Sequence, residues 1–161
     1  MTRTRIKICG ITREEDLAAA VVAGADALGF VFYPPSPRSV EPTRAATLLA
    51  RVPPFVTSVG LFVNESPVAV RAILDRLSLD LLQFHGDEDA AYCAQFGKPW
   101  IKAARVKPGF DLLEYAAAFS GVPGVVGLLL DAYVDGYGGG GEAFDWSLIP
   151  RSLPLPVILS G

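Results

Sequence analysis

The sequence predicts an α/β fold built on a parallel sheet, and three observations lead to that class. Seven short apolar runs rich in β-branched residues alternate with stretches of helical composition along the 161 residues. The runs recur about every 20 to 30 residues, which leaves room for one helix in each crossover between parallel strands. No linker or shift in composition divides the chain. We therefore expect one layer of strands with helices packed against it.

The expected elements follow from these patterns in chain order. The strands are expected at 5–9, 26–32, 55–63, 79–85, 100–104, 125–131 and 155–159. The helices are expected at 14–22, 43–51, 68–77, 89–96 and 112–119. The first helix has the clearest signals, because Thr12 and Glu15 have the spacing of a capping box and Gly24 stands where a left-handed residue ends a helix.

A parallel sheet covered by helices is either an open doubly wound sheet or a closed barrel. The first strand-to-helix turn of a doubly wound nucleotide binder carries G-x-G-x-x-G, whereas this turn reads CGITRE. In a (β/α)8 barrel, the TIM barrel, reactive residues stand at the C-terminal ends of several strands, as Cys9, His85 and Asp131 do here. We therefore expect residues 1–161 to form a single TIM-barrel domain. It would hold seven of the eight strands and be truncated after the seventh, because such barrels usually need at least about 200 residues.

Composition excludes several classes of function. Acidic residues number 17 and basic residues 14, giving a net charge of −3 without long runs of one sign, which argues against a nucleic-acid partner. The N-terminus lacks the apolar core of a secretory signal, and the longest apolar stretch is far short of the roughly 20 residues of a membrane span. We expect a soluble cytoplasmic protein in which Cys9 and Cys93 are free thiols.

Lys7 and Cys9 are the first candidate site residues. Side chains alternate along a strand, so Lys7 and Cys9 share one face while Ile6 and Ile8 share the other. If the isoleucines face the helices, the lysine points into the barrel beside the thiol, where its charge favours a thiolate able to act as base or nucleophile. The alternative is that Cys9 is a small buried apolar residue. Cys93 lies within a helical pattern and is assigned that structural role.

The ends of the fourth and sixth strands supply further candidates. Asp131 follows three leucines, and burial there would favour the protonated form that a general acid needs; a loop aspartate that caps the next turn is the alternative. His85 is the only histidine and shares its face with Gln83. A lone histidine without partners at ligand spacing makes no metal site, so a hydrogen bond to substrate or a structural role remains.

Arg38 follows a loop that prolines stiffen, YPPSP. An arginine held on such a loop suits bidentate recognition of a carboxylate or phosphate, although a surface arginine without function is the alternative.

Taken together, these motifs resemble one family. KICGIT, GADALGFVFYPPSPR, VGLFVN, LQFHGDE, IKA, LLLDAY with GYGGGGEAFDW, and VILSG occur in this order over 7–161. This set resembles the phosphoribosylanthranilate isomerases of tryptophan biosynthesis. The resemblance implies a (β/α)8 barrel that converts N-(5-phosphoribosyl)anthranilate to 1-(2-carboxyphenylamino)-1-deoxyribulose 5-phosphate by an Amadori rearrangement. It implies no metal or organic cofactor, a phosphorylated small molecule as the partner, and a monomer or homodimer.

The resemblance also implies roles for single residues. Cys9 matches the general base and Asp131 the general acid, and Arg38 matches the residue that binds the anthranilate carboxylate. Lys7, Gln83 and His85 match positions near the substrate. Ser160 and Gly161 match positions in the loop that binds its phosphate.

The C-terminus departs from the family pattern, because members usually continue with a seventh helix, an eighth strand and an eighth helix. Most of the phosphate site on the loops after strands seven and eight would then be missing. Two alternatives to the isomerase stay open at this stage. One is another sugar-phosphate isomerase or synthase of the same barrel class. The other is a non-catalytic fragment that folds only with a complementing piece.

Overall fold

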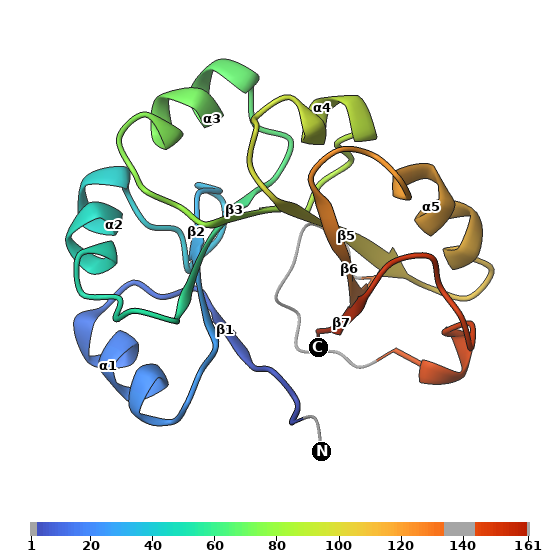
Figure 1. Ribbon diagram of the computed structural model, residues 1–161, viewed down its shortest axis with the longest axis horizontal. Helices are drawn as coiled ribbons and strands as arrows, with labels where there is room; N and C mark the ends of the chain where they lie inside the picture. The colour runs from blue at the N-terminus through green and yellow to red at the C-terminus, as the bar shows by residue number, and fades with distance from the viewer. Residues whose placement is uncertain (1–2, 134–143, 161) are drawn as a thin grey trace. The chain divides into compact units, whose positions relative to one another are not determined.

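The computed structural model describes residues 3–133 and 144–160, in which strands and helices alternate along the chain (Figure 1). The strands are β1 (Lys7–Cys9), β2 (Ala27–Val31), β3 (Thr57–Phe62), β4 (Leu81–Phe84), β5 (Trp100–Val106), β6 (Val125–Ala132) and β7 (Val157–Leu159). The helices are α1 (Glu14–Val22), α2 (Pro42–Leu49), α3 (Pro67–Leu74), α4 (Ala90–Ala94) and α5 (Leu112–Phe119), followed by the 3₁₀ turn η1 (Trp146–Leu148). The chain forms two compact units, Met1–Leu82 and Gln83–Gly161.

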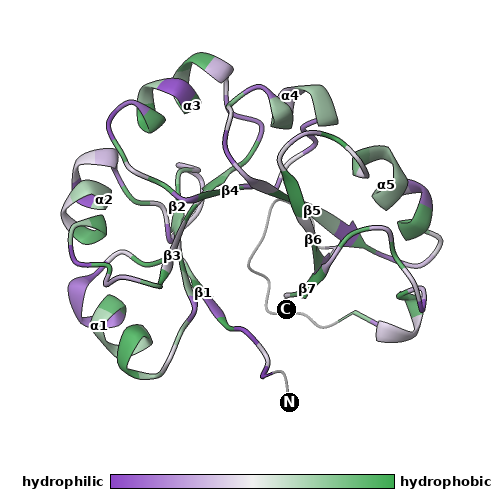
Figure 2. Ribbon diagram, viewed as in Figure 1, coloured by the Kyte–Doolittle hydropathy of each residue, from purple (hydrophilic) through white to green (hydrophobic). Residues whose placement is uncertain are grey.

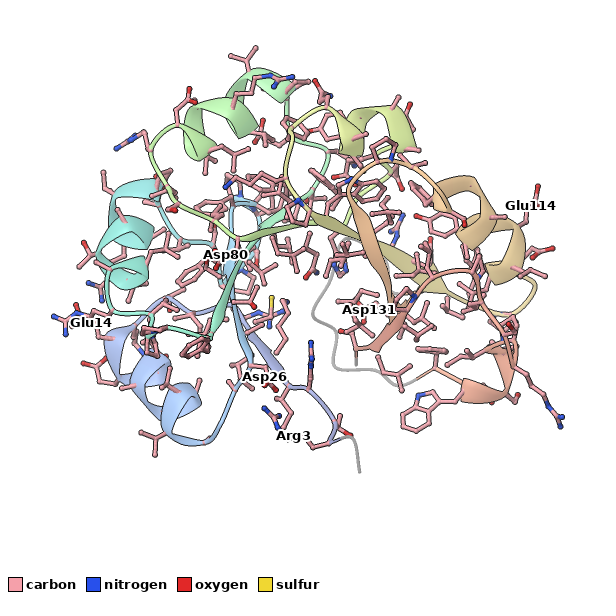
Figure 3. The ribbon with its side chains drawn as sticks, in the orientation of Figure 1. Arg3, Glu14, Asp26, Asp80, Glu114 and Asp131 are labelled. Atoms are coloured by element: carbon pink, nitrogen blue, oxygen red, sulfur yellow. The ribbon has the colours of Figure 1, made fainter. Side chains whose placement is uncertain are left out.

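In the first unit, β1, β2 and β3 pair side by side as parallel strands. Cys9 lies opposite Gly29, and Gly29 in turn lies opposite Val59. The start of β1 is tied to the start of β2, because the Asp26 carboxylate accepts the Ile6 N–H at 2.9 Å and forms an ion pair with Arg3 (Figure 3). These contacts fix the register that sets which residues stand at the end of each strand.

In the second unit, β5, β6 and β7 are parallel, and Arg105 of β5 lies opposite Asp131 of β6. Trp100 anchors the layer between strands and helices, with its ring 6.1 Å from Phe119 of α5 and 6.3 Å from Phe84 of β4, centroid to centroid. Every residue of β5 except Arg105 is buried, as expected for a strand covered on both faces, although the strand includes hydrophilic positions on the scale of Figure 2.

The strand and helix pattern expected from the sequence is confirmed. α1 and α5 have the predicted bounds, and the other elements differ by a few residues at their ends. Gly24 has φ +86°, as predicted for the residue that follows a helix. The predicted capping box at Thr12 is wrong. Arg13 is the N-cap residue and its side chain makes no capping hydrogen bond; its guanidinium instead donates to Asp16 at 2.7 and 2.8 Å.

No helix in the two described ranges combines the length and the hydropathy that crossing a bilayer requires.

Candidate active site

The end of β1 in the first unit brings Cys9 and Lys7 together. Both side chains lie over Gly29 of β2: a Cβ built on this glycine would lie 2.8 Å from Cys9 Sγ and 3.1 Å from Lys7 Nζ. Cys9 is half-buried and its thiol is free. The strand alternation predicted from the sequence is therefore confirmed, with lysine and cysteine on one face of the sheet. The absence of a side chain at Gly29 makes the space that they share.

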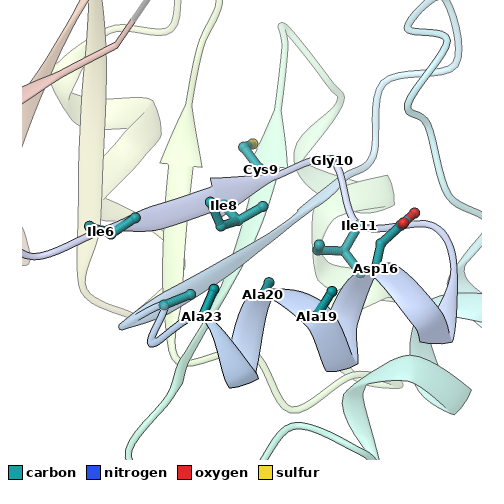
Figure 4. A pocket seen from close by; sticks show the side chains of 10 residues that line it. Ile6, Ile8, Cys9, Gly10, Ile11, Asp16, Ala19, Ala20 and Ala23 are labelled. Carbon is teal, nitrogen blue, oxygen red and sulfur yellow. The ribbon is translucent and has the colours of Figure 1, made fainter.

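The opposite face of β1 is apolar. Ile6 and Ile8 point toward α1 and line a groove with Ala19, Ala20 and Ala23, whereas the side chain of Cys9 points away from the helix (Figure 4). Because this groove lies on the helix side of the strand, it is not the place where the thiol would meet a substrate.

Arg38 lies beside the same strand end. Its Nη1 donates to the carbonyl oxygen of Cys9 at 3.3 Å, and its aliphatic chain crosses Gly10. Gly10 has φ +90°, and a Cβ there would lie 2.6 Å from Arg38 Cδ. Position 10 thus requires glycine both for its backbone conformation and for the arginine that packs on it. The first unit brings together three of the residues predicted from the sequence: Lys7, Cys9 and Arg38.

The second unit brings together Gln83, His85 and Asp131. His85 Nδ1 lies 2.9 Å from Gln83 Nε2, and His85 Nε2 lies 3.0 Å from Asp131 Oδ2. All three side chains are buried. With this amide orientation Gln83 donates to Nδ1, so the ring carries its proton on Nε2 and donates it to the carboxylate. The other carboxylate oxygen, Oδ1, accepts the N–H of Ala132 at 3.1 Å.

This arrangement specifies what the second unit can do chemically. At the end of β6, a ring nitrogen of His85 can donate a hydrogen bond to the carboxylate of Asp131, and such a contact stabilises a carboxylate. Gln83 holds the ring in the tautomer that this needs. The buried Oε1 of Gln83 is the one buried side-chain nitrogen or oxygen in the described part of the chain that makes no hydrogen bond. It is therefore an acceptor open to a ligand or a water.

Ser160 follows β7, and its N–H donates to the carbonyl of Leu130 at 2.9 Å, one residue before Asp131. Gly161 and the glycine run at 138–141 lie outside the described residues. Within residues 3–133 and 144–160, no group of three or more His, Cys, Asp or Glu side chains is placed to hold a metal ion.

Two groups near the site did not enter the sequence-based candidates. Arg105 lies opposite Asp131 in the register and pairs with Asp87 at 3.1 Å. Lys102 and Glu88 form a buried ion pair, 3.3 Å from Nζ to Oε2. The signal for Lys102 was its position as the single charge within the apolar run WIKAA, since a buried charge needs a partner.

The family model of N-(5'-phosphoribosyl)anthranilate (PRA) isomerases matches residues 6–161. The chain belongs to the N-(5'-phosphoribosyl)anthranilate isomerase family. A member from Dechloromonas aromatica is 65% identical over 159 residues, which cover 99% of this chain and 75% of that protein. One from Pseudomonas aeruginosa is 57% identical over 162 residues, covering 100% of this chain and 75% of that protein. This chain thus spans about three quarters of the length of these isomerases.

Solved structures of phosphoribosylanthranilate isomerases have the same fold. The Thermotoga maritima isomerase matches with a TM-score of 0.84 at 39% identity, covering 99% of this chain and 77% of that one. An isomerase in complex with reduced 1-(o-carboxyphenylamino)-1-deoxyribulose 5-phosphate matches with a TM-score of 0.71 at 38% identity, covering 81% of this chain and 66% of that one. The α/β fold of the TIM-barrel class predicted from the sequence is thereby confirmed.

Proposed function

We propose that this protein isomerises N-(5'-phosphoribosyl)anthranilate to 1-(o-carboxyphenylamino)-1-deoxyribulose 5-phosphate, with Cys9 as general base and Asp131 as general acid. Membership of the isomerase family over 6–161 carries the reaction and its place in tryptophan biosynthesis. The observation that supports the two roles is their local chemistry: a free, half-buried thiol next to a lysine, and a buried carboxyl next to a neutral imidazole.

The reaction needs an acid first. Asp131 gives its proton to the ring oxygen of the ribose, the C1–O bond breaks, and the nitrogen lone pair forms the C1=N bond of an iminium ion. His85 then stabilises the carboxylate through the hydrogen bond from Nε2. The proton supplied by the protein and the electron pair supplied by the substrate nitrogen together open the ring.

The base acts second. Cys9 as thiolate removes the proton from C2, and the C2–H electron pair forms a C1=C2 bond while the iminium electrons return to nitrogen. The resulting enolamine takes up a proton at C1 and loses the hydroxyl proton at C2, which leaves the ketone. Lys7 Nζ lies beside the same thiol in the space above Gly29. No atom is gained or lost, as an isomerisation requires.

The remaining predicted residues bind the substrate in this proposal. Arg38, held at Cys9 by its contact with the carbonyl oxygen, pairs with the anthranilate carboxylate. Ser160 and Gly161 contribute to the phosphate site, and Gln83 offers its open Oε1 as a hydrogen-bond acceptor. We also propose that the two compact units are parts of one barrel domain in the cytoplasm. Whether it is a monomer or a homodimer stays a prediction; one solved structure is of monomers generated from the dimeric isomerase of Thermotoga maritima.

The test compares Cys9→Ala and Asp131→Asn with wild type in the full-length protein. Removing a positioned acid or base should lower kcat by about 10²- to 10⁴-fold with a small change in KM. Cys93→Ala is the matched control, because it removes the other thiol, which is buried in α4. It should keep kcat within about twofold of wild type, as expected for a residue outside the reaction. Wild-type turnover in either test variant would show that the role assigned to that residue is wrong.

A further inference from the structure

Lys102 is an ammonium buried on the helix side of β5. None of its side chain is exposed, and it shares its face of the strand with Trp100 and Ala104. Its Nζ lies 6.0 Å from the ring centroid of Phe119 in α5. This is the apolar layer between strands and helices, on the opposite face of the strand from Arg105. A charge placed here needs a partner to compensate for the loss of water.

Apart from the carbonyl oxygen of Ala103 at 3.4 Å, the partners of Lys102 surround one residue, His85. Nζ donates to the carbonyl oxygen of Phe84 at 3.4 Å and to that of Gly86 at 2.6 Å. Glu88, 2% exposed, accepts the N–H of Gly86 at 2.8 Å through the Oε2 atom that also pairs with Nζ. The three peptide groups from Phe84 to Asp87 are thus each held by one member of the ion pair. These are the peptide groups that set the backbone position of His85.

Stability alone is a poor explanation for this pair. Replacing a buried ion pair by apolar residues of similar volume is often neutral or stabilising, because desolvation offsets the attraction. Burial lowers the pKa of Lys102, and the neighbouring Glu88 opposes that shift. An apolar pair would fill the same space, yet it would leave the carbonyls of Phe84 and Gly86 and the N–H of Gly86 without these partners. What the ion pair supplies is a fixed backbone at His85.

We propose that Lys102 and Glu88 are positioning residues that act through His85, holding its ring so that Nε2 faces Asp131. The proposal rests on the function proposed above, in which Asp131 is the acid. Neither residue touches the substrate in this proposal: both lie on the helix side of the strands, whereas His85 contacts Gln83 and Asp131. Loss of the pair would let the loop that follows β4 shift, and misplacement of a catalytic group by about 1 Å costs on the order of a hundredfold in rate.

The test removes both charges at once, in Lys102→Met/Glu88→Gln, so that no unpaired charge stays buried. The methionine keeps an unbranched apolar chain, and the glutamine keeps an oxygen for the Gly86 N–H. We expect kcat to fall by about 10- to 100-fold with KM within about threefold of wild type. Tyr115→Phe is the matched control, since Tyr115 donates to the carbonyl of Ala103, next to Lys102, but contacts none of the three peptide groups around His85. Tyr115→Phe should keep kcat within about twofold of wild type, because the contact that it removes takes no part in the reaction.

A spectroscopic readout follows His85, the only histidine among residues 1–161, and its signal is identified by its loss in His85→Asn. In protein labelled with ¹⁵N-histidine, wild type should show one ring with its proton on Nε2. The double variant should show a mixture of tautomers and faster exchange of the Nε2 proton with water. This measurement needs no enzymatic turnover, so it tests the positioning role even if wild type proves to have a different activity. If the double variant does not fold, Glu88→Gln alone is measured in the same two ways.

Two results would overturn the proposal. One is a folded variant with wild-type kcat and an unchanged imidazole spectrum. The other comes from combining the double substitution with His85→Asn. If the pair acts through His85, it should add less than about twofold to the loss in kcat already caused by His85→Asn, because residues that act as a unit are non-additive. A further 10- to 100-fold loss of kcat when the double substitution is added to His85→Asn would show that the pair acts by another route.

Discussion

The side-chain amide of Gln83 donates to Nδ1 of His85 across 2.9 Å, and this contact decides which ring nitrogen carries the proton. The opposite nitrogen, Nε2, then faces Asp131 at 3.0 Å as a donor. The histidine is thereby a donor with a fixed direction. In the proposed mechanism, the role of Asp131 as a proton donor depends on an amide in β4, two residues before the histidine that follows this strand.

Gln83→Met tests this dependence. Methionine has a similar length but cannot donate, so Nδ1 loses its partner, and an unsatisfied buried polar atom costs about 1–3 kcal/mol. We expect kcat to fall about tenfold, because roughly 1.4 kcal/mol of transition-state stabilisation corresponds to that factor. Kinetics and the ¹⁵N spectrum of the single histidine measure the two effects. Leu81→Met, which makes a change of similar size on the same face of β4, should alter neither; an unchanged tautomer in Gln83→Met would contradict the assignment.

Gly29→Ala tests the shared space above β2. The new Cβ would lie 2.8 Å from Cys9 Sγ and 3.1 Å from Lys7 Nζ, so both side chains must move. The nearest backbone atom, Cys9 Cα, would lie at 3.2 Å, so a shift of a few tenths of an ångström suffices there, and we expect the fold to persist with a loss of stability of about 1–3 kcal/mol. The displaced thiol should lower kcat by about 10- to 100-fold. Thermal unfolding and steady-state kinetics separate the two effects, and wild-type kcat in the folded variant would contradict the placement of the thiol.

The sequence predicted these local groups because they depend on short-range rules. Alternation along β1 placed Lys7 and Cys9 on one face, and the same rule paired Gln83 with His85. The contact of Lys102 with Glu88 joins residues 14 positions apart and depends on how β5 packs against the loop after β4, which no local pattern contains. The failure at Thr12 has a local cause: Arg13 pairs with Asp16, and the helix begins one residue after the arginine.

The two thiols should differ in reactivity. Cys9 is half-exposed, whereas burial raises the pKa of Cys93 from 9.0 to about 12. At pH 8 that shift lowers the thiolate fraction of Cys93 about a thousandfold relative to an unperturbed thiol. A thiol reagent should therefore label one cysteine per native chain rapidly, and both only after unfolding. Peptide mapping identifies the labelled residue, and Cys9→Ala should abolish the rapid phase; rapid labelling of Cys93 would contradict its burial.

Asp26 should make the stability of the folded chain depend on pH in the acidic range. The Arg3 guanidinium and the Ile6 N–H lower the pKa of its carboxyl from 3.8 to about 2. A carboxyl whose pKa is lower in the folded chain stabilises that chain above the unfolded pKa and loses its effect as pH falls toward the folded pKa. The contribution is therefore complete above about pH 4 and lost between about pH 4 and pH 2.

Urea midpoints of wild type and Asp26→Asn should converge over this window and differ at pH 6. Arg3→Met should reproduce much of the effect, because Arg3 is its largest cause, and added salt should reduce it, since the pair is at the surface. A wild-type-to-variant difference that stays constant from pH 6 to pH 2 would show that the Asp26 contacts at the start of β1 do not stabilise the folded chain through charge.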